Sequence, residues 1–183
     1  GILVTFAAVP GGTREIAAFV ISSITLVILY SMSTLYHPFP FPVVKQVFRV
    51  FDHSSRFLLS AGTYTPFMLI TLQGKGKGLI IFIVVWACTL IGITLNAISV
   101  NRFAKLSLVL YLIMGWSIIF AIGDVVAALG NGVWLLLAGG ISYTVGVAFY
   151  LAKRIKYMHS VWHLFVLAGS VLHYLCIAIH VLP

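Results

Sequence analysis

The chain has 183 residues, of which 62% are hydrophobic and only 8% charged, and its formal net charge at pH 7 is +8. A mean hydropathy of +1.15 excludes an ordinary water-soluble domain. The excess of basic residues is explained by a solvated face beside anionic lipid headgroups. Because no basic and aromatic module of the kind that reads nucleic acid is present, we expect no nucleic-acid partner.

Six continuous apolar stretches predict membrane-spanning helices, since about 20 apolar residues cross a bilayer core. They are residues 16–36, 53–72, 78–98, 106–122, 133–151 and 158–182. The apolar start, residues 1–9, is too short to span, and we expect it to belong to a truncated first helix. The predicted fold class is therefore all-α, a polytopic seven-transmembrane helix bundle that forms one domain over residues 1–183.

Two local features modify these helices. Residues 43–51 have apolar side chains at helical spacing and predict a short interfacial helix, with an irregular apolar loop as the alternative. Pro66 lies within a predicted span and should kink it, because proline lacks a backbone donor. The kink either opens space for a lipid chain or is only a packing adjustment.

The basic residues predict the orientation in the membrane, because lysine and arginine favour the cytoplasmic side. One side carries eight of them: Lys45, Arg49, Arg56, Arg102, Lys105, Lys153, Arg154 and Lys156. The other side carries Arg14, Lys75 and Lys77. We therefore expect a multi-pass protein of the cell membrane with its N-terminus inside and its C-terminus outside.

This topology predicts that three histidines and a carboxylate lie near the cytosolic face. His37 follows one span and Asp52 precedes the next, while His159 and His163 occupy the first turns of the last span. Ionisable side chains are expensive in hydrocarbon and usually face a bundle interior, where they perform a function.

The histidines are candidate zinc ligands. His159 and His163 are four residues apart, so a helix places both rings on one face, about 6 Å apart along its axis. Such a pair can hold one metal ion, and His37 from another helix can complete the set. Zinc with three protein ligands keeps its fourth position for water, whose pKa falls to about 7. The alternative is that these histidines are packing groups.

Two further residues are candidates for catalysis. Asp52 would act as the general base or hold the water by a hydrogen bond. Its alternative role is an N-cap of the span that begins at residue 53, paired with Arg56 four residues on. Ser33 lies one turn before His37 and would orient the water or polarise a substrate carbonyl, the alternative being a packing serine.

Three segments together resemble the bacterial hemolysin III proteins of the progestin and adipoQ receptor family, which includes the adiponectin receptors. They read STLYH at 33–37, FDHS at 51–54 running into AGTYTP at 61–66, and HSVWH at 159–163. The resemblance implies seven helices with the N-terminus inside. It also implies a zinc held near the cytosolic side by His37, His159, His163 and a water, with Asp52 on the water and Ser33 matching the family serine.

Three functions are compatible with this pattern. Because relatives in the wider group include alkaline ceramidases, the resemblance implies a zinc-dependent intramembrane hydrolase acting on a lipid amide or ester, with a membrane lipid as substrate or ligand. The first alternative is a non-enzymatic channel or pore-forming hemolysin, which would need a polar stripe along several helices. The second alternative is a zinc-stabilised sensor or regulator of membrane state.

Overall fold

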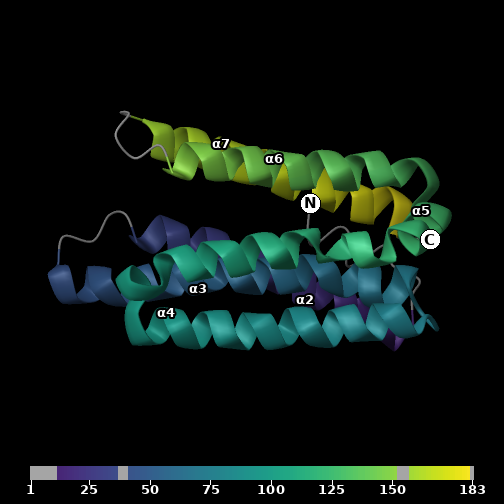
Figure 1. Ribbon diagram of the computed structural model, residues 1–183, viewed down its shortest axis with the longest axis horizontal. Helices are drawn as coiled ribbons and strands as arrows, with labels where there is room; N and C mark the ends of the chain where they lie inside the picture. Colours follow the sequence, from purple (N-terminus) through teal and green to yellow (C-terminus); the bar gives the residue numbers. More distant parts are fainter. Residues whose placement is uncertain (1–11, 37–40, 152–156, 182–183) are drawn as a thin grey trace. The chain divides into compact units, whose positions relative to one another are not determined.

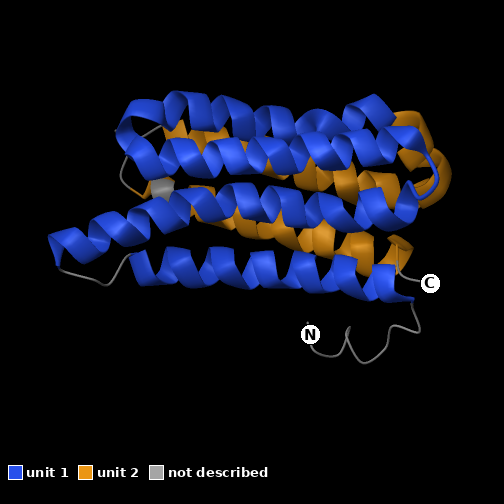
Figure 2. Cartoon of the chain, turned by 90° about the horizontal axis from the view of Figure 1, so that it is seen from below, with its two compact units in different colours: residues 1–121 blue, residues 122–183 orange. Residues whose placement is uncertain are grey.

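The computed structural model describes residues 12–36, 41–151 and 157–181, and every regular element in these ranges is helical (Figure 1). The elements are α2 (Thr13–Tyr36), α3 (Pro42–Pro66), η1 (Phe67–Thr71), α4 (Gly76–Trp116), η2 (Ser117–Ala121), α5 (Ile122–Leu129), η3 (Gly130–Gly132), α6 (Val133–Leu151), α7 (Met158–Cys176) and η4 (Ile177–Val181). They form two compact units, Gly1–Ala121 and Ile122–Pro183, which Figure 2 colours separately. The all-α prediction is confirmed for these residues.

The six predicted spans fall on helices in the described ranges, but α3 and η1, on which the predicted span 53–72 falls, are not among the segments apolar enough to cross a membrane. Three segments are long and apolar enough to cross a membrane: Thr13–Tyr36, Gly76–Leu151 and Ser160–Val181. Since the second of these holds several helices in succession, the chain is built as a multi-pass membrane protein. The expected truncated first helix, residues 1–9, lies outside the described residues.

Helix α3 begins earlier than the sequence predicted. It is continuous from Pro42 to Pro66, so the expected interfacial helix and the span after it are one helix, and the loop alternative is wrong. Phe41 has an extended backbone (φ −77°, ψ 122°) and Pro42 occupies the first helical position, where its missing N–H costs nothing. No glycine or proline follows before Gly62, so nothing interrupts the helix between residues 43 and 61.

The interruption expected at Pro66 takes the form of a change in hydrogen-bond register. The α-helix ends there and a π-helical turn, η1, follows. The N–H of Leu72 donates to the carbonyl of Phe67 at 2.9 Å, five residues back. The chain then turns through Gly74, whose φ of 76° favours a residue without Cβ, before α4 begins.

Helix α4 has two limbs, which correspond to the predicted spans 78–98 and 106–122. Ser99 leaves the helical conformation (φ −168°, ψ 106°), and the chain turns back on itself within the first unit (Figure 1). Across this reversal, the Ser107 hydroxyl donates to Asn96 Oδ1 at 3.1 Å. The reversal therefore places two limbs of one helix side by side and joins them by a buried polar contact.

The interior of the first unit is built from close helix contacts. Helix α3 packs against both α2 and α4. The ring of Phe57, only 2% exposed, lies so near Gly92 of α4 that an added Cβ would sit 2.5 Å from Cε1. Small residues allow this approach between helices in lipid, where packing replaces hydrophobic association.

The Tyr64 hydroxyl supports the place where α4 gives way to the 3-10 turn η2. It donates to the carbonyl of Gly115 at 2.7 Å and accepts from the N–H of Ile118 at 3.0 Å. Both backbone groups lie at a helix end, where the regular hydrogen-bond pattern stops. A side chain from α3 therefore satisfies the main chain of a neighbouring helix in the apolar interior.

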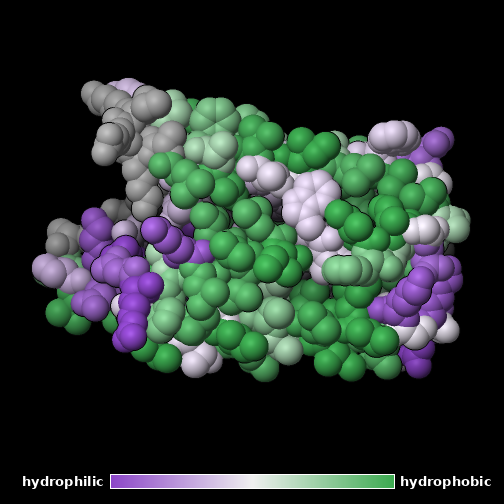
Figure 3. Space-filling model, in the orientation of Figure 1, coloured by the Kyte–Doolittle hydropathy of each residue, from purple (hydrophilic) through white to green (hydrophobic). Residues whose placement is uncertain are grey.

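Large apolar side chains face outward on α4. Leu79 is 59% exposed, Ile83 57% and Leu90 64%. In Figure 3, apolar residues cover the middle of the view, and hydrophilic ones gather at both ends, one of which is the start of α3. Such an apolar surface in a soluble protein would mark an aggregation liability. We expect such a surface on a helix that faces lipid.

The second unit is an α6–α7 hairpin with a polar seam. The Ser142 hydroxyl donates to the Phe165 carbonyl at 2.8 Å, and the Tyr143 and Ser170 hydroxyls lie 2.8 Å apart. His173 Nε2 lies 3.1 Å from the Leu136 carbonyl oxygen, with its ring over Gly139. These contacts pair the hydroxyl groups and His173 Nε2 between apolar helices, whereas His173 Nδ1 has no hydrogen-bond partner among the described residues.

Replacing Gly92 with alanine should destabilise the first unit, because the new methyl group would overlap the Phe57 ring. Overpacking of this kind costs about 1–3 kcal/mol. The matched control in the same helix is Gly115→Ala, where an added Cβ meets nothing within 4 Å. Reversible unfolding in mixed micelles measures both variants, and equal stabilities would contradict the close contact.

Candidate functional site

One end of the first unit collects the residues around the predicted site. Lys45 Nζ lies 5.9 Å from the centre of the Tyr36 ring, so the end of α2 is beside the start of α3. Arg49 Nη2 donates to Asn101 Oδ1 at 2.6 Å, which brings the reversal in α4 to the same end. His37, which follows Tyr36 directly, lies outside the described residues.

Asp52 is a buried carboxylate inside α3. It is 4% exposed, and Arg56 Nη2 donates to its Oδ2 at 2.7 Å. The predicted N-cap role is wrong, because α3 begins at Pro42, ten residues before Asp52. The predicted pairing with Arg56 is confirmed. A buried charge is tolerated where such a partner lies one helical turn away.

Ser33 lies in the last turn of α2 and is partly buried. It belongs to the first unit together with Asp52. Its position one turn before residue 37 is the one that the sequence predicted, since α2 is helical through Tyr36.

The other two candidate ligands lie on α7 in the second unit. The helix begins at Met158, so its backbone places His159 and His163 on successive turns of one face. The side chain of His159 lies outside the described structure. The centre of the His163 ring lies 4.4 Å from the centre of the Trp162 ring. Tyr157, just before the helix, has a left-handed backbone with φ of 69°, a conformation that costs a non-glycine residue energy.

The described side chains, which do not include those of His37 and His159, hold no group of three or more His, Cys, Asp or Glu residues that could bind a metal ion. The histidine set therefore stays a prediction from the sequence. What the fold contributes is the helical spacing of His159 and His163 on α7, together with the ionic partner of Asp52.

Sequence reasoning missed one buried polar pair. Asn96 is 1% exposed and Ser107 is 8% exposed, and they bond to each other across the two limbs of α4. Asn96 Nδ2 has no hydrogen-bond partner in the described structure. The sequence did contain a signal for this pair, because Asn96 is an amide inside a predicted span. A polar group in hydrocarbon is costly unless it has a partner, so a partner for Asn96 could have been expected.

Comparison with known proteins gives the same family as the motifs. Residues 1–174 match the family described as Haemolysin-III related. The chain is 43% identical to Hemolysin-3 of Bacillus cereus over 183 residues, covering 100% of this chain and 83% of that protein. It is 41% identical to the Hemolysin-3 homolog of Bacillus subtilis over 176 residues, covering 96% and 82% respectively. A more distant relative is the human Monocyte to macrophage differentiation factor, 25% identical over 164 residues, covering 88% and 64%.

Removing the partner of Asp52 should destabilise the protein strongly. In Arg56→Met the carboxylate would stay buried without its counter-charge, which costs about 3 kcal/mol. Unfolding in mixed micelles measures the loss. The matched control is Arg56→Lys, which keeps the positive charge and should lose less.

The double variant Asp52→Leu, Arg56→Met should recover most of that stability, because no buried charge remains. A double variant as unstable as Arg56→Met alone would mean that arginine packing, and not the ion pair, carries the effect.

Proposed function

The chain belongs to the hemolysin III family, and from this premise we propose that it is a zinc-binding membrane protein that hydrolyses a lipid amide or ester. The observation that carries the proposal is the pair of histidines, His159 and His163, on successive turns of α7. A helix presents such a pair to one metal ion on one face.

We propose seven transmembrane helices in the cell membrane, with the N-terminus inside and the C-terminus outside. The support comes from the basic residues of the first unit. Lys45, Arg49 and Arg102 lie at the end that holds the start of α3 and the α4 reversal, whereas Lys75 and Lys77 lie at the start of α4. Because positive residues favour the cytoplasmic side, we propose that residue 37 and Asp52 lie near the cytosolic face.

The proposed zinc ligands are His37, His159 and His163. Imidazole is a usual donor for zinc, and three histidines leave one coordination position for water. The i and i+4 spacing within α7 fits this donor set, and residue 37 follows a helix that ends at the proposed cytosolic side. A zinc ion bound there supplies Lewis-acid polarisation of a carbonyl and a water of lowered pKa.

Asp52, Arg56 and Ser33 would handle the water proton and orient the reacting groups. An ionised carboxylate has only acceptor atoms, so Asp52 would accept a hydrogen bond from the attacking water and then its proton. Arg56 would hold that carboxylate in place through Oδ2. Ser33 would donate a hydrogen bond to the water or to the substrate carbonyl. A lipid is the proposed substrate because the apolar helices of the chain are those of a multi-pass membrane protein.

The printed name of the bacterial relatives supports a second candidate, a pore-forming hemolysin. Ion flux would need a continuous polar stripe, and the outward faces of α4 are apolar. A zinc-stabilised sensor of membrane state would keep the same ligands without turnover.

His163→Ala should abolish both zinc binding and hydrolysis, because two imidazoles hold zinc more weakly than three. X-ray fluorescence of the detergent-purified protein measures metal, and a fluorescent ceramide measures hydrolysis. The wild type should carry about one zinc per chain. The matched control is His180→Ala, a histidine in η4 at the other end of the same helical segment, which should keep both.

Turnover that persists without metal would reject the hydrolase mechanism. Metal binding without turnover of any lipid would favour the sensor. Ion flux through liposomes that survives metal removal would favour the pore.

A further inference from the structure

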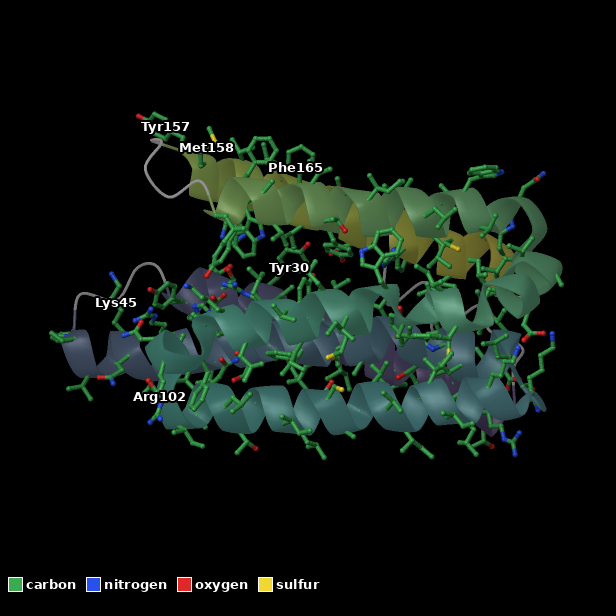
Figure 4. All side chains as sticks on the ribbon, viewed as in Figure 1. Tyr30, Lys45, Arg102, Tyr157, Met158 and Phe165 are labelled. Carbon is green, nitrogen blue, oxygen red and sulfur yellow. The ribbon has the colours of Figure 1, made fainter. Side chains whose placement is uncertain are left out.

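A cluster of basic side chains lies at the end of the first unit where α3 begins. We define the basic cluster as Lys45, Arg49 and Arg102. Lys45 and Arg49 are one turn apart on α3, and Asn101, next to Arg102, accepts from Arg49 Nη2 at 2.6 Å. Figure 4 shows Lys45 and Arg102 at the same end of this unit. Lys105 follows one turn after Arg102 and is exposed.

No carboxylate of the first unit neutralises this basic cluster. Residues 1–121 contain two acidic residues, Glu15 and Asp52. Glu15 lies in the first turn of α2, at the other end of that helix from Tyr36. Asp52 is buried and paired with Arg56. The basic cluster therefore presents net positive charge and attracts an anion.

An apolar stripe runs along the same turns of α3. Val43 is 75% exposed, Val47 49% and Phe51 52%, at successive spacings of four residues. Lys45 and Arg49 follow Val43 and Val47 by two residues each, so they point to the opposite side of the helix, about 200° away. The start of α3 projects beyond the neighbouring helices of the first unit (Figures 1 and 2). Such an amphipathic segment suits the boundary between headgroups and acyl chains.

We propose that the basic cluster binds the phosphate headgroup of an anionic phospholipid at the membrane boundary. Guanidinium groups match phosphate geometry with paired hydrogen bonds. Asn101 already holds the Arg49 side chain, which lowers the entropy lost on binding. The apolar stripe on the other side of the same turns favours a position at the boundary between headgroups and acyl chains, where the available anion is a lipid headgroup rather than a free phosphate ion. None of the three residues is a proposed zinc ligand, and the proposal does not depend on hydrolysis.

The test is lipid competition on the full chain. Native mass spectrometry of the detergent-purified protein, given equal amounts of phosphatidylglycerol and phosphatidylcholine, measures how much of each stays bound. The wild type should retain phosphatidylglycerol preferentially. The triple variant Lys45→Gln, Arg49→Gln, Arg102→Gln should lose that preference, at about fivefold per positive charge removed.

The matched control is Lys75→Gln, Lys77→Gln at the opposite end of the unit, which should keep the preference. If the triple variant fails to fold, Arg102→Gln alone decides, since this exposed residue should tolerate the change and reduce the preference severalfold. An unchanged preference in either cluster variant would overturn the proposal. Competition by inorganic phosphate as effective as by phosphatidylglycerol would also overturn it, because the site would then take a free anion.

Discussion

The ion pair between Asp52 and Arg56 is the constraint on which the first unit depends. Water cannot hydrate a buried carboxylate, so a charge in the packed interior needs its counter-charge close by. Helix α3 provides both partners one turn apart, at 2.7 Å. The buried charges of this unit, Asp52 and Arg56, therefore both belong to α3.

Helix α3 also carries the contacts that hold its neighbours. Phe57 packs against Gly92 of α4, and the Tyr64 hydroxyl bonds the backbone where α4 ends. The same helix begins with the basic cluster and its apolar stripe. One continuous helix thus links the membrane boundary, the buried carboxylate and the packed core.

The helices and the spacing of the histidines could be predicted from the sequence, because long apolar stretches and an i and i+4 pair are local patterns. The start of α3 could not, since Lys45 and Arg49 lower the local hydropathy and made residues 43–51 look like a separate segment. The role of Asp52 was open between a general base and an N-cap paired with Arg56, and the N-cap alternative depends on where the helix starts. A connection between the apolar stretches 78–98 and 106–122 was predicted. The contact of Asn96 with Ser107 could not be predicted, because it depends on the reversal occurring at Ser99, and no glycine or proline marks that position. His37 and the His159 side chain lie outside the described residues, so the three-histidine set remains a proposal.

The central claim is that three histidines hold a zinc ion with one position left for water. X-ray absorption at the zinc edge on the purified protein tests it most directly. The account predicts about three imidazole nitrogens at about 2.0–2.1 Å and one lighter oxygen ligand, without sulfur. A sulfur shell, or fewer than three imidazoles around the metal, would contradict it.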